Sequence, residues 1–504
     1  MFELYDIETR NLMEDPPSAE AAELIDHDTA SRMTVLPLYK RDGRLWVAMQ
    51  NPLDFNLIAD LHDITGLFIE PVLAEEQDIR YFINQLYSSA HIKNIASQFL
   101  VDENIRKSEY QLSSEHREQI QSAPVVKLID SLIESAVLYQ ASDIHIEPYE
   151  HTLRARFRVD GQLTNSQSIS SDMLLNIISR LKIMGNLNIA ERRLPQDASF
   201  SLVVLGKAVD FRLSIMPTHY GEKAVIRLLY SKGERLSTTE LGFSQDDMPS
   251  INRLFSSAYG SVIITGPTGS GKTTTLTSFM STLNKEDVNI ITVEDPIENP
   301  IEGVNHVAID PKSGLDFPRA LRHILRQDPD IIMVGEIRDA ETASIAMRAA
   351  ITGHVMLTTL HTNDAAGVFP RLVDMGVEPF LVAAALNGVI AQRLVRRLCP
   401  FCKEEHSITI AEAAWLKIEP DSKVYAARGC NLCGKTGYKG RFALYEYIII
   451  DDEMRNDLAA AGYDPRSIQK ILVRNMSSMV SCGARNILEG NTSVEEVVRV
   501  VYRA

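Results

Sequence analysis

The chain has 504 residues, of which 45% are hydrophobic and 23% are charged, and its formal net charge is -16. This length is too great for one hydrophobic core, and at about 100 to 200 residues per domain it predicts three or four domains. The composition excludes extensive disorder, and the negative charge argues against a broad nucleic-acid footprint.

The sequence also bears on the compartment. It contains no run of about 18 uncharged apolar residues. Its first residues, "MFELYDIETRNLMEDPP", are acidic where a signal peptide is basic and then apolar. We therefore expect a cytosolic protein, in which five cysteines are metal ligands, reactive thiols or core residues rather than disulfides.

Residues 1–105 are predicted to form a first domain. Within it, "MTVLPLYKRDGRLWVAM" indicates two short strands around an Asp-Gly turn. The polar stretch that follows, "DENIRKSEYQLSSEHREQIQSA", has little apolar periodicity, and we place a linker at residues 106–123.

Residues 124–235 are predicted to form a second domain. It opens with a helix whose apolar residues recur at helical spacing, namely Val126, Ile129, Leu132, Ile133 and Val137. A strand-like segment, "TLRARFRVDGQL", then places Arg154, Arg156 and Arg158 on one face. Such a face is either simply solvated or able to bind phosphate.

Residues 236–395 alternate between strand and helix patterns. The strands are predicted at "SVIITG", "VNIITVED", "DIIMVGEI" and "HVMLTTLH", with helices from Lys272, around residues 317–326 and from Ala340. Short apolar strands between helices of about 10 to 15 residues indicate an α/β fold with a parallel sheet and helical crossovers.

A phosphate-binding loop follows the first of these strands. "GPTGSGKT" fits G-x-x-x-x-G-K-[ST] and precedes a helix, as a P-loop requires. Backbone N–H groups and Lys272 bind the phosphates of ATP in such a loop, and the Thr273 hydroxyl binds Mg²⁺. The predicted nucleotide-binding residues are Gly266, Pro267, Thr268, Gly269, Ser270, Gly271, Lys272, Thr273 and Thr274.

Acidic residues end the next two strands. "TVEDPIE" contains Glu294, Asp295 and Glu298, and "DIIMVGEIRD" is a Walker B strand with Glu336 where aspartate is commoner. Because parallel strands end at one edge of a sheet, these carboxylates should lie beside the P-loop. There they can hold Mg²⁺ through its waters or orient the attacking water.

Two histidines flank the fourth strand. His354 stands at the start and His361 at the end of "HVMLTTLH". Both are interpreted as nucleotide sensors beside the γ-phosphate, His361 with more weight, and the competing interpretation is that each is a structural histidine.

The cysteines form two pairs at C-x₂-C spacing, Cys399 with Cys402 and Cys430 with Cys433. Two such pairs can supply four thiolates to one tetrahedral, structural Zn²⁺, and the 27 intervening residues are easily closed. The alternative is redox-active or unligated cysteines, and Cys482 is interpreted as a core thiol. We place the zinc module at residues 396–441 and a C-terminal helical domain at residues 442–504.

These motifs carry a family resemblance. "GPTGSGKTTT", "TVEDPIE", "IIMVGEIRD" and "TGHVMLTTLHTNDA" resemble, in order, the Walker A, Asp, Walker B and His boxes of the secretion and pilus motor ATPases, the GspE/PulE/PilB group. The likeness extends to "RLPQD", "QRLVRRLCPFC" and "GYKGRFALYE". It is strong over residues 124–504 and looser over the first hundred.

The resemblance implies a RecA-like P-loop ATPase domain preceded by a PAS-like α+β lobe. It adds a small zinc-binding insertion and a further small α+β N-terminal domain. Such motors are homohexamers that act through an inner-membrane platform protein to assemble a type IV pilus or a type II secretion pseudopilus. The N-terminal domain would contact a membrane-associated recruitment protein, so the chain would be cytoplasmic and peripherally attached to the inner membrane.

The resemblance also implies residue roles. It makes Glu298 the catalytic base, places Glu294 and Glu336 near water and Mg²⁺, and turns Arg193 and Arg212 toward nucleotide phosphate. Arg158 is a weaker candidate for such a contact. The group usually has Gly-Arg after "PQD", where this chain has Ala198 and Ser199. One arginine of the usual set is therefore missing or replaced.

Other functions fit less well. A DNA-translocating RecA-like motor needs a basic channel and stacking aromatics, whereas this chain is acidic, so we predict no nucleic-acid partner. A nucleotide-binding regulator with little hydrolysis is a third possibility. Retraction motors generally lack both a long N-terminal domain and the tetracysteine insertion, which favours assembly or secretion. The repeated Arg-Leu-Gly and spaced-leucine pattern of cyclic di-GMP sites is not found in residues 1–105, so no such site is predicted.

Overall fold

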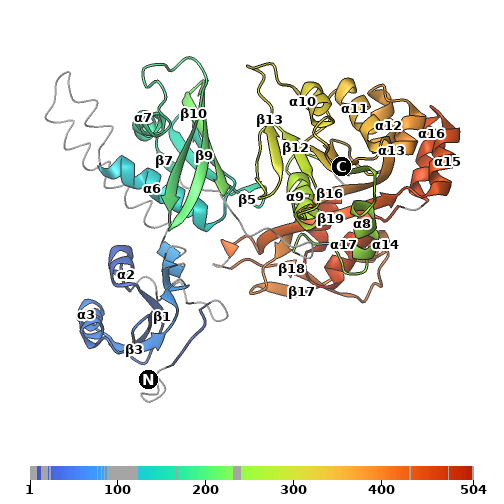
Figure 1. Ribbon diagram of the computed structural model, residues 1–504. Helices are drawn as coiled ribbons and strands as arrows, with labels where there is room; N and C mark the ends of the chain where they lie inside the picture. Colours follow the sequence, from blue (N-terminus) through green and yellow to red (C-terminus); the bar gives the residue numbers. More distant parts are fainter. Residues whose placement is uncertain are drawn as a thin grey trace. The chain divides into compact units, whose positions relative to one another are not determined.

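The computed structural model describes residues 8–12, 17, 21, 24–76, 78–80, 82–83, 86–87, 123–164, 168–230, 240–430, 433–474 and 476–501. The predicted linker, apart from its last residue, and the predicted boundary at residue 235 lie outside these ranges. Among the described residues, no helix combines the length and the apolar character that crossing a bilayer requires. The chain divides into two compact units, residues 1–231 with 430–435 and residues 232–429 with 436–504 (Figure 1).

The first unit begins with a small α+β domain around a three-stranded sheet of order β1-β2-β3. Its elements are α2 (His27–Met33), β1 (Val35–Arg41), β2 (Arg44–Met49), α3 (Phe55–Thr65) and β3 (Phe68–Leu73). Strands β1 and β2 pair antiparallel across Asp42 and Gly43, which both have positive φ, at 50° and 76°. The predicted Asp-Gly hairpin is therefore confirmed.

The first unit also contains a larger α+β domain. Its helices are α6 (Ala123–Leu138), η2 (Ser171–Met173) and α7 (Leu174–Met184). Its strands are β4 (Asp143–Pro148), β5 (Thr152–Val159), β6 (Gln162–Leu163), β7 (Ser168–Ser170), β8 (Gln196–Val204), β9 (Lys207–Thr218) and β10 (Gly221–Tyr230). They form one sheet of order β6-β5-β4-β10-β9-β8, and β7 pairs with β5.

The predicted helix and the predicted arginine-bearing strand of this domain are both present, and one residue of the helix's buried face differs from the prediction. In α6 the buried face includes Val125 rather than the predicted Val126, which is half-buried. Strand β5 alternates buried residues with Arg154, Arg156 and Arg158, so these arginines share one face as predicted. Two of them pair with acids on β4, Arg156 with Glu147 at 2.6 Å and Arg158 with Asp143 at 3.7 Å.

The second unit is built on a seven-stranded sheet of order β13-β12-β14-β15-β11-β16-β19. Six strands run parallel and β19 runs antiparallel to β16. They are β11 (Gly260–Thr265), β12 (Ile290–Glu294), β13 (Asn305–Ala308), β14 (Ile331–Val334), β15 (Val355–Leu360), β16 (Leu386–Leu398) and β19 (Tyr438–Ile449).

One helix precedes the first of these strands, and the others connect the strands or follow the last one. They are α8 (Met248–Phe255), α9 (Lys272–Leu283), α10 (Phe317–Ile324), α11 (Ala340–Ile351), α12 (Val368–Asp374), α13 (Pro379–Ala385), α14 (Ile410–Leu416), α15 (Asp452–Ala461), α16 (Pro465–Val473), α17 (Met479–Leu488) and α18 (Val494–Val501). Asp316 and Asp339 cap α10 and α11 with side-chain hydrogen bonds, which fixes where these two helices begin. The predicted α/β alternation is confirmed, because β11, β12, β14 and β15 are buried on both faces between helical crossovers.

The C-terminal boundaries differ from the sequence-based prediction. The predicted boundary at 395/396 falls inside β16, and the boundary at 441/442 falls inside β19. These strands pair from Gly388 with Ile449 to Leu398 with Tyr438, and Figure 1 shows them side by side. The tetracysteine segment, with β17 (Lys403–Ser407) and β18 (Lys423–Ala427), is thus inserted between two neighbouring strands of the seven-stranded sheet. The predicted helical domain consequently begins with a strand of that sheet.

Candidate nucleotide site

The loop after β11 has the backbone of a phosphate cradle. Gly266, Gly269 and Gly271 have φ of 146°, 77° and 85°, a region that residues with a side chain rarely adopt. Helix α9 begins at Lys272, directly after the last of these glycines. The N–H groups of its first turn therefore face the loop, as anion binding at a helix N-terminus requires.

Lys272 lies against the same loop. Its side chain is nearly buried, with the residue 8% exposed, and Nζ donates to the carbonyl oxygens of Gly266 at 2.9 Å and Pro267 at 3.1 Å. Burial lowers the pKa of the ammonium, and the nearby carboxylate of Glu336 opposes that shift. The ammonium thus bonds to neutral carbonyl oxygens of the loop and keeps its positive charge there, which suits it to an anionic ligand.

A pocket of about 500 Å³ opens above this loop. The P-loop residues Thr268–Thr274 line it, together with Glu294, Asp295, Glu298, Gly335, Glu336, Arg338, Thr359, His361, Leu394 and Arg441. The three glutamates predicted for catalysis, Glu294, Glu298 and Glu336, therefore meet with Asp295 and His361 at the carboxyl edge of the sheet, because β12, β14 and β15 all end there.

Glu294 is the most enclosed of the three carboxylates. The residue is 5% exposed, and its Oε1 accepts hydrogen bonds from Thr292 Oγ1 at 2.6 Å and from His306 Nδ1 at 2.8 Å. His306 Nε2 accepts the backbone N–H of Ile301 at 2.9 Å, so the imidazole proton belongs on Nδ1. Glu294 is thus oriented by neighbours on β12 and β13.

Glu336 is half-buried and lies among charged groups. It bonds to Arg338, and its Oε2 lies 3.7 Å from Nε2 of His361. Burial lowers the pKa of His361, Lys272 lowers it further, and Glu336 acts in the opposite direction. At neutral pH the imidazole is therefore uncharged and can accept or donate one hydrogen bond in the pocket.

Glu298 differs from both. It is exposed at the pocket, and among the described residues it makes no hydrogen bond or ion pair. A carboxylate without protein partners keeps its oxygens available for water.

His354 does not belong to this constellation. It precedes β15, and its Nδ1 lies 3.2 Å from the carbonyl oxygen of Ala349 while its own carbonyl accepts the N–H of Gly260. Because β11 and β15 are parallel, this is the amino edge of the sheet, opposite the P-loop. The expectation that His354 lies beside the γ-phosphate is therefore wrong, since a whole strand separates it from the pocket.

Four residues at or beside the site had no predicted role. Arg338 and Arg441 line the pocket, His306 orients Glu294, and Gln392 contacts the P-loop. Arg338 follows Glu336 closely in "GEIRD", so proximity in sequence could have identified it. The other three come from distant strands; Gln392 and Arg441 lie in segments that resemble the family, but neither segment was assigned a role at the nucleotide site.

Arg193 and Arg212 belong to the first unit. Arg193 is exposed in the segment before β8, where its backbone N–H donates to Glu191. Arg212 lies on the exposed face of β9 and lines a second, shallow pocket with Asp197, Ser199 and Arg227. Ser199, where an arginine was expected, is the direct partner of Arg212 in the β8–β9 ladder. Arg227 is the partner of Arg212 on the other side, in β10.

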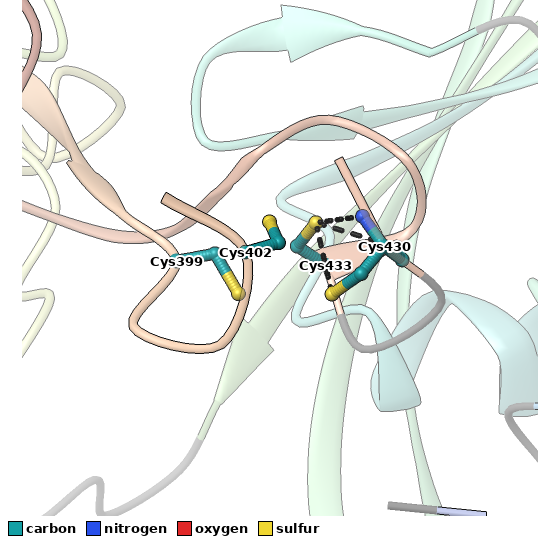
Figure 2. A group of neighbouring side chains, drawn as sticks. All are labelled: Cys399, Cys402, Cys430 and Cys433. Atoms are coloured by element: carbon teal, nitrogen blue, oxygen red, sulfur yellow. Dashed lines mark hydrogen bonds between the residues drawn. The ribbon is translucent and has the colours of Figure 1, made fainter. Parts of the chain in front are cut away.

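The four patterned cysteines form one cluster. Their sulfur atoms all lie within 4.8 Å of one another, and Figure 2 shows the side chains gathered from two loops. Four thiolates at about 2.3 Å from a tetrahedral Zn²⁺ would be about 3.8 Å apart, and Cys430 and Cys433 are 3.7 Å apart. The backbone N–H of Cys430 also donates to the sulfur of Cys433, as is usual for a thiolate ligand. None of the five cysteines forms a disulfide, and Cys482 is buried as predicted for a core thiol.

Comparison with known proteins identifies the family. Residues 118–499 match the family described as Type II/IV secretion system protein, and residues 5–93 match the MshEN domain. The Type IV pilus assembly ATPase PilB of Myxococcus xanthus is 42% identical over 504 residues, which cover 98% of this chain and 89% of that protein. The Type II secretion system protein E of Pseudomonas aeruginosa is 46% identical over 76% of each chain.

The chain belongs to the Type II/IV secretion system protein family. As a member of this family it is a P-loop motor ATPase that hydrolyses ATP, which agrees with the pocket around Lys272. The solved structure of the Legionella pneumophila ATPase DotB has a TM-score of 0.56 at 22% identity, covering 75% of this chain and 96% of that one. That likeness shows the shared RecA-like ATPase fold.

Proposed function

We propose that the protein is a homohexameric motor that couples ATP hydrolysis to assembly of a type IV pilus or a type II secretion pseudopilus. An inner-membrane platform protein would receive the force, and a membrane-associated recruitment protein would bind the N-terminal domain. The chain would then be cytoplasmic and peripherally attached to the inner membrane. The observation that carries this proposal is the P-loop pocket with its converging carboxylates, in a chain whose relatives are named for these two machineries.

Within the pocket we assign roles by position. The P-loop N–H groups and Lys272 hold the phosphates, and the Thr273 hydroxyl would hold Mg²⁺, which neutralises charge that develops on the phosphate oxygens. Glu298 is the base that takes the proton of the attacking water, because its oxygens are not engaged by the described protein groups. Glu294 and Glu336 position water, and His361 senses the γ-phosphate as an uncharged imidazole.

The larger α+β domain of the first unit, from α6 to β10, is proposed to be the PAS-like lobe, with Arg193 and Arg212 directed toward nucleotide phosphate. Arg212 supports this role because it is exposed and shares a pocket with Arg227. Arg227 would then replace the guanidinium that Ser199 lacks, since both are ladder partners of Arg212. Arg227 and Arg158 both pair with Asp143, at 2.9 Å and 3.7 Å, and Arg158 is the poorer candidate because its side chain is 35% exposed whereas that of Arg227 is 61% exposed.

The tetracysteine cluster is proposed to hold one structural Zn²⁺. Three of its cysteines are buried and the fourth is half-buried, so the four thiolates would leave no open position for chemistry. Metal analysis of the full-length protein should give one zinc per chain. Cys430→Ser should lower that content sharply, and full zinc content in this variant would contradict the assignment.

The N-terminal domain is proposed to recruit a protein partner without binding cyclic di-GMP. The matched MshEN domain leaves this prediction open, because the Arg-Leu-Gly pattern is not present in residues 1–105. Titration of the full-length protein with cyclic di-GMP should give no saturable signal. Saturable binding that is lost on deletion of residues 1–105 would overturn this part of the proposal.

The motor proposal is tested by ATP turnover of the assembled oligomer. Wild type should hydrolyse ATP faster when the cytoplasmic part of the platform protein is added, whereas single- or double-stranded DNA should have no effect. Stimulation by DNA without a response to the platform protein would favour a DNA-translocating motor. Lys272→Ala should lose hydrolysis by about 10²-fold or more, because one preorganised charge at the phosphates is removed. Equal rates for this variant and wild type would favour a nucleotide-binding regulator.

A further inference from the structure

A buried amide lies beside the P-loop. Gln392, on β16, is 1% exposed, although a polar side chain in a core is costly unless its groups are hydrogen-bonded. Both ends of the amide are bonded here. Its Nε2 donates to the carbonyl oxygen of Ser270 at 2.7 Å, and its Oε1 accepts from Thr275 Oγ1 at 2.9 Å. This side chain therefore joins the sheet to the phosphate-binding loop.

The strand register explains why this contact arises. The last pair in the parallel ladder between β11 and β16 joins Thr265 to Ala391. Strand β16 continues along β19, so Gln392 stands beside Gly266, where the chain of β11 turns into the loop. A longer strand beside a shorter one thus places a side chain under the P-loop.

Two P-loop glycines are packed against the same residue. A Cβ on Gly266 would lie 2.3 Å from the carbonyl oxygen of Gln392, and a Cβ on Gly271 would lie 2.8 Å from its Nε2. These distances are too short for a side chain at either position. The glycines of the motif therefore serve the contact with β16 as well as the backbone conformation of the loop.

The two hydrogen bonds of Gln392 bracket the nucleotide-contacting residues. Ser270 precedes and Thr275 follows the segment that contains Lys272 and Thr273. The amide of Gln392 thus fixes the end of the loop in position relative to the first turn of α9. A displacement of reacting groups by about 1 Å can lower a rate by about 10²-fold, so the relative position of the loop and the helix matters to turnover.

The neighbouring residue of β16 holds a second loop of the pocket. Arg393 donates to the carbonyl oxygen of Asn363, just after His361, and to that of Val500 in α18. Consecutive residues of one strand therefore contact the P-loop and the loop that carries His361.

We propose that Gln392 is a positioning residue for ATP hydrolysis. It does not line the pocket and acts through the main chain of Ser270 and the hydroxyl of Thr275. The proposal rests on ATP hydrolysis in this pocket. The proposal predicts that loss of the amide's hydrogen bonds lowers turnover, and that a loss of stability without loss of these hydrogen bonds does not.

The first test compares Gln392→Met with Val395→Ala in the full-length chain. Methionine keeps the length of the side chain but removes both hydrogen bonds, and Val395 is a fully buried residue of the same strand that serves as the stability control. Gln392→Met should lower kcat by about 10- to 100-fold with a smaller change in KM. Val395→Ala should lower the melting temperature while kcat stays near the wild-type value.

The second test is the pH profile of Gln392→Glu. A protonated glutamic acid can donate to Ser270 and accept from Thr275, whereas its carboxylate cannot donate, and burial raises the pKa of such a group. The kcat of this variant relative to wild type should therefore rise several-fold from pH 8 to pH 6. Val395→Ala should show no such rise.

A third variant examines the other end of the contact. Thr275→Val should lower kcat, and its combination with Gln392→Met should cost less than the sum of the two single effects, since both remove the same hydrogen bond.

These outcomes separate the inference from the activity on which it rests. If wild type hydrolyses no ATP, the proposed use of the pocket fails. If wild type is active and Gln392→Met keeps kcat within about twofold, the positioning role is overturned. The positioning role also fails if Gln392→Met does not fold and Gln392→Glu shows no recovery at low pH, or if Thr275→Val retains full activity.

Discussion

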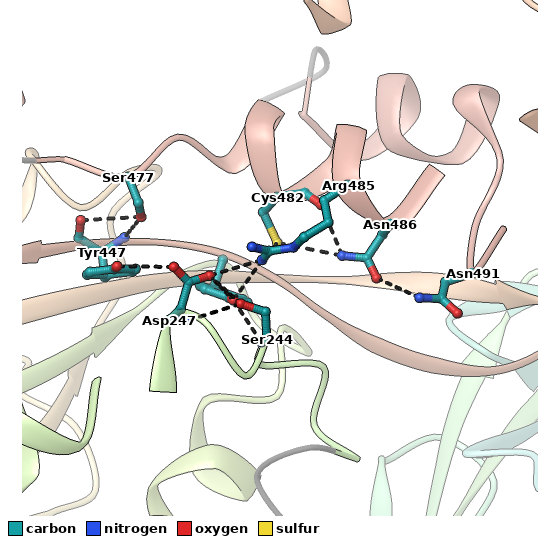
Figure 3. A network of polar contacts seen from close by, with 9 residues as sticks. Ser244, Asp247, Tyr447, Ser477, Cys482, Arg485, Asn486 and Asn491 are labelled. Atoms are coloured by element: carbon teal, nitrogen blue, oxygen red, sulfur yellow. Dashed lines mark hydrogen bonds and ion pairs between the residues drawn. The ribbon is translucent and has the colours of Figure 1, made fainter. Parts of the chain in front are cut away.

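Two carboxylates of the second unit lie in opposite environments, one enclosed by hydrogen-bond donors and the other open to the pocket. Asp247, before α8, is 20% exposed at its side chain and is enclosed by donors: Ser244 at 2.7 Å, Arg485 at 3.0 Å and the hydroxyls of Tyr445 and Tyr447 (Figure 3). Glu298 is exposed at the nucleotide pocket, and none of the described residues bonds to it. Both side chains carry the same chemical group, so their partners distinguish them.

The partners decide what each acid can do. Both oxygens of Asp247 accept hydrogen bonds, which join the start of α8 to β19 and α17, about 200 residues further along the chain. Such a network stabilises the fold, with three donors on Oδ2 and one on Oδ1. Glu298 has no such partners among the described residues, so its oxygens stay accessible in the pocket. Substitutions at the two positions should therefore give opposite results.

The largest expected effect is on turnover. Glu298→Gln should lower kcat by about 10²- to 10⁴-fold, because a positioned base is removed, while ATP binding is retained. Asp247→Asn should leave kcat near the wild-type value. Steady-state ATP hydrolysis and nucleotide titration measure both. A Glu298→Gln variant with wild-type kcat would remove Glu298 from the mechanism and with it the contrast between the two acids.

The second effect is on stability. Asp247→Asn should lower the free energy of unfolding by about 2 to 3 kcal/mol, since the amide presents N–H groups to several donors. Glu298→Gln should change it by less than about 0.5 kcal/mol. Asp457→Asn is the control, because Asp457 pairs with Arg474 on the surface and should cost about 1 kcal/mol or less. Denaturant unfolding followed by tryptophan fluorescence measures the differences, and equal costs at Asp247 and Asp457 would contradict the network.

Substitution of His361 should lower kcat by an amount between the effects of Glu298→Gln and Asp247→Asn. His361→Gln should lower kcat by about tenfold, the equivalent of one hydrogen bond of about 1 to 1.5 kcal/mol. Because burial and Lys272 lower the pKa of His361 below its ordinary value of 6.5, the neutral imidazole predominates at and above pH 6.5. The variant and wild type should therefore have parallel kcat profiles from pH 6.5 to 8. A change of kcat with pH that is present in wild type and absent from His361→Gln would show that His361 titrates in that range.

The smallest effect is the acid dependence of stability. Burial raises the pKa of Asp247, but hydrogen bonds from Tyr445, Ser244 and Arg485 outweigh burial and lower it below its ordinary value of 3.8. The folded state thus binds the proton less tightly than the unfolded state, so this stabilisation is present above about pH 4 and is lost at lower pH. Wild type should lose more unfolding free energy than Asp247→Asn between pH 4 and 3. Parallel curves would show that Asp247 is not preferentially stabilised as a carboxylate.

Local patterns predicted a large part of this molecule. The P-loop needs its glycines, lysine and threonine within eight residues, so its chemistry can be recognised in a short segment. The carboxylates could be placed at one edge because parallel strands separated by helices must end together. The C-x₂-C pairs could be assigned to one cluster because their spacing suits thiolate ligands.

Other features could not be predicted, because they depend on which distant segments become neighbours. His354 and His361 flank one strand, and only the strand direction relative to β11 shows that His361 alone of the two reaches the pocket. The boundaries near residues 395 and 441 were misplaced because β16 and β19 pair across the tetracysteine insertion.

Short segments of the sequence determine which chemical groups this protein has available: a loop that binds ATP, acids that follow buried strands, and four thiols in two pairs. Each of these is encoded within a few residues, where backbone conformation and spacing are local properties. Tertiary packing selected which acid is enclosed and which is open, and it placed Gln392 beneath the P-loop. Those outcomes depend on the register of strands and on burial, which arise only when segments far apart in the chain pack together.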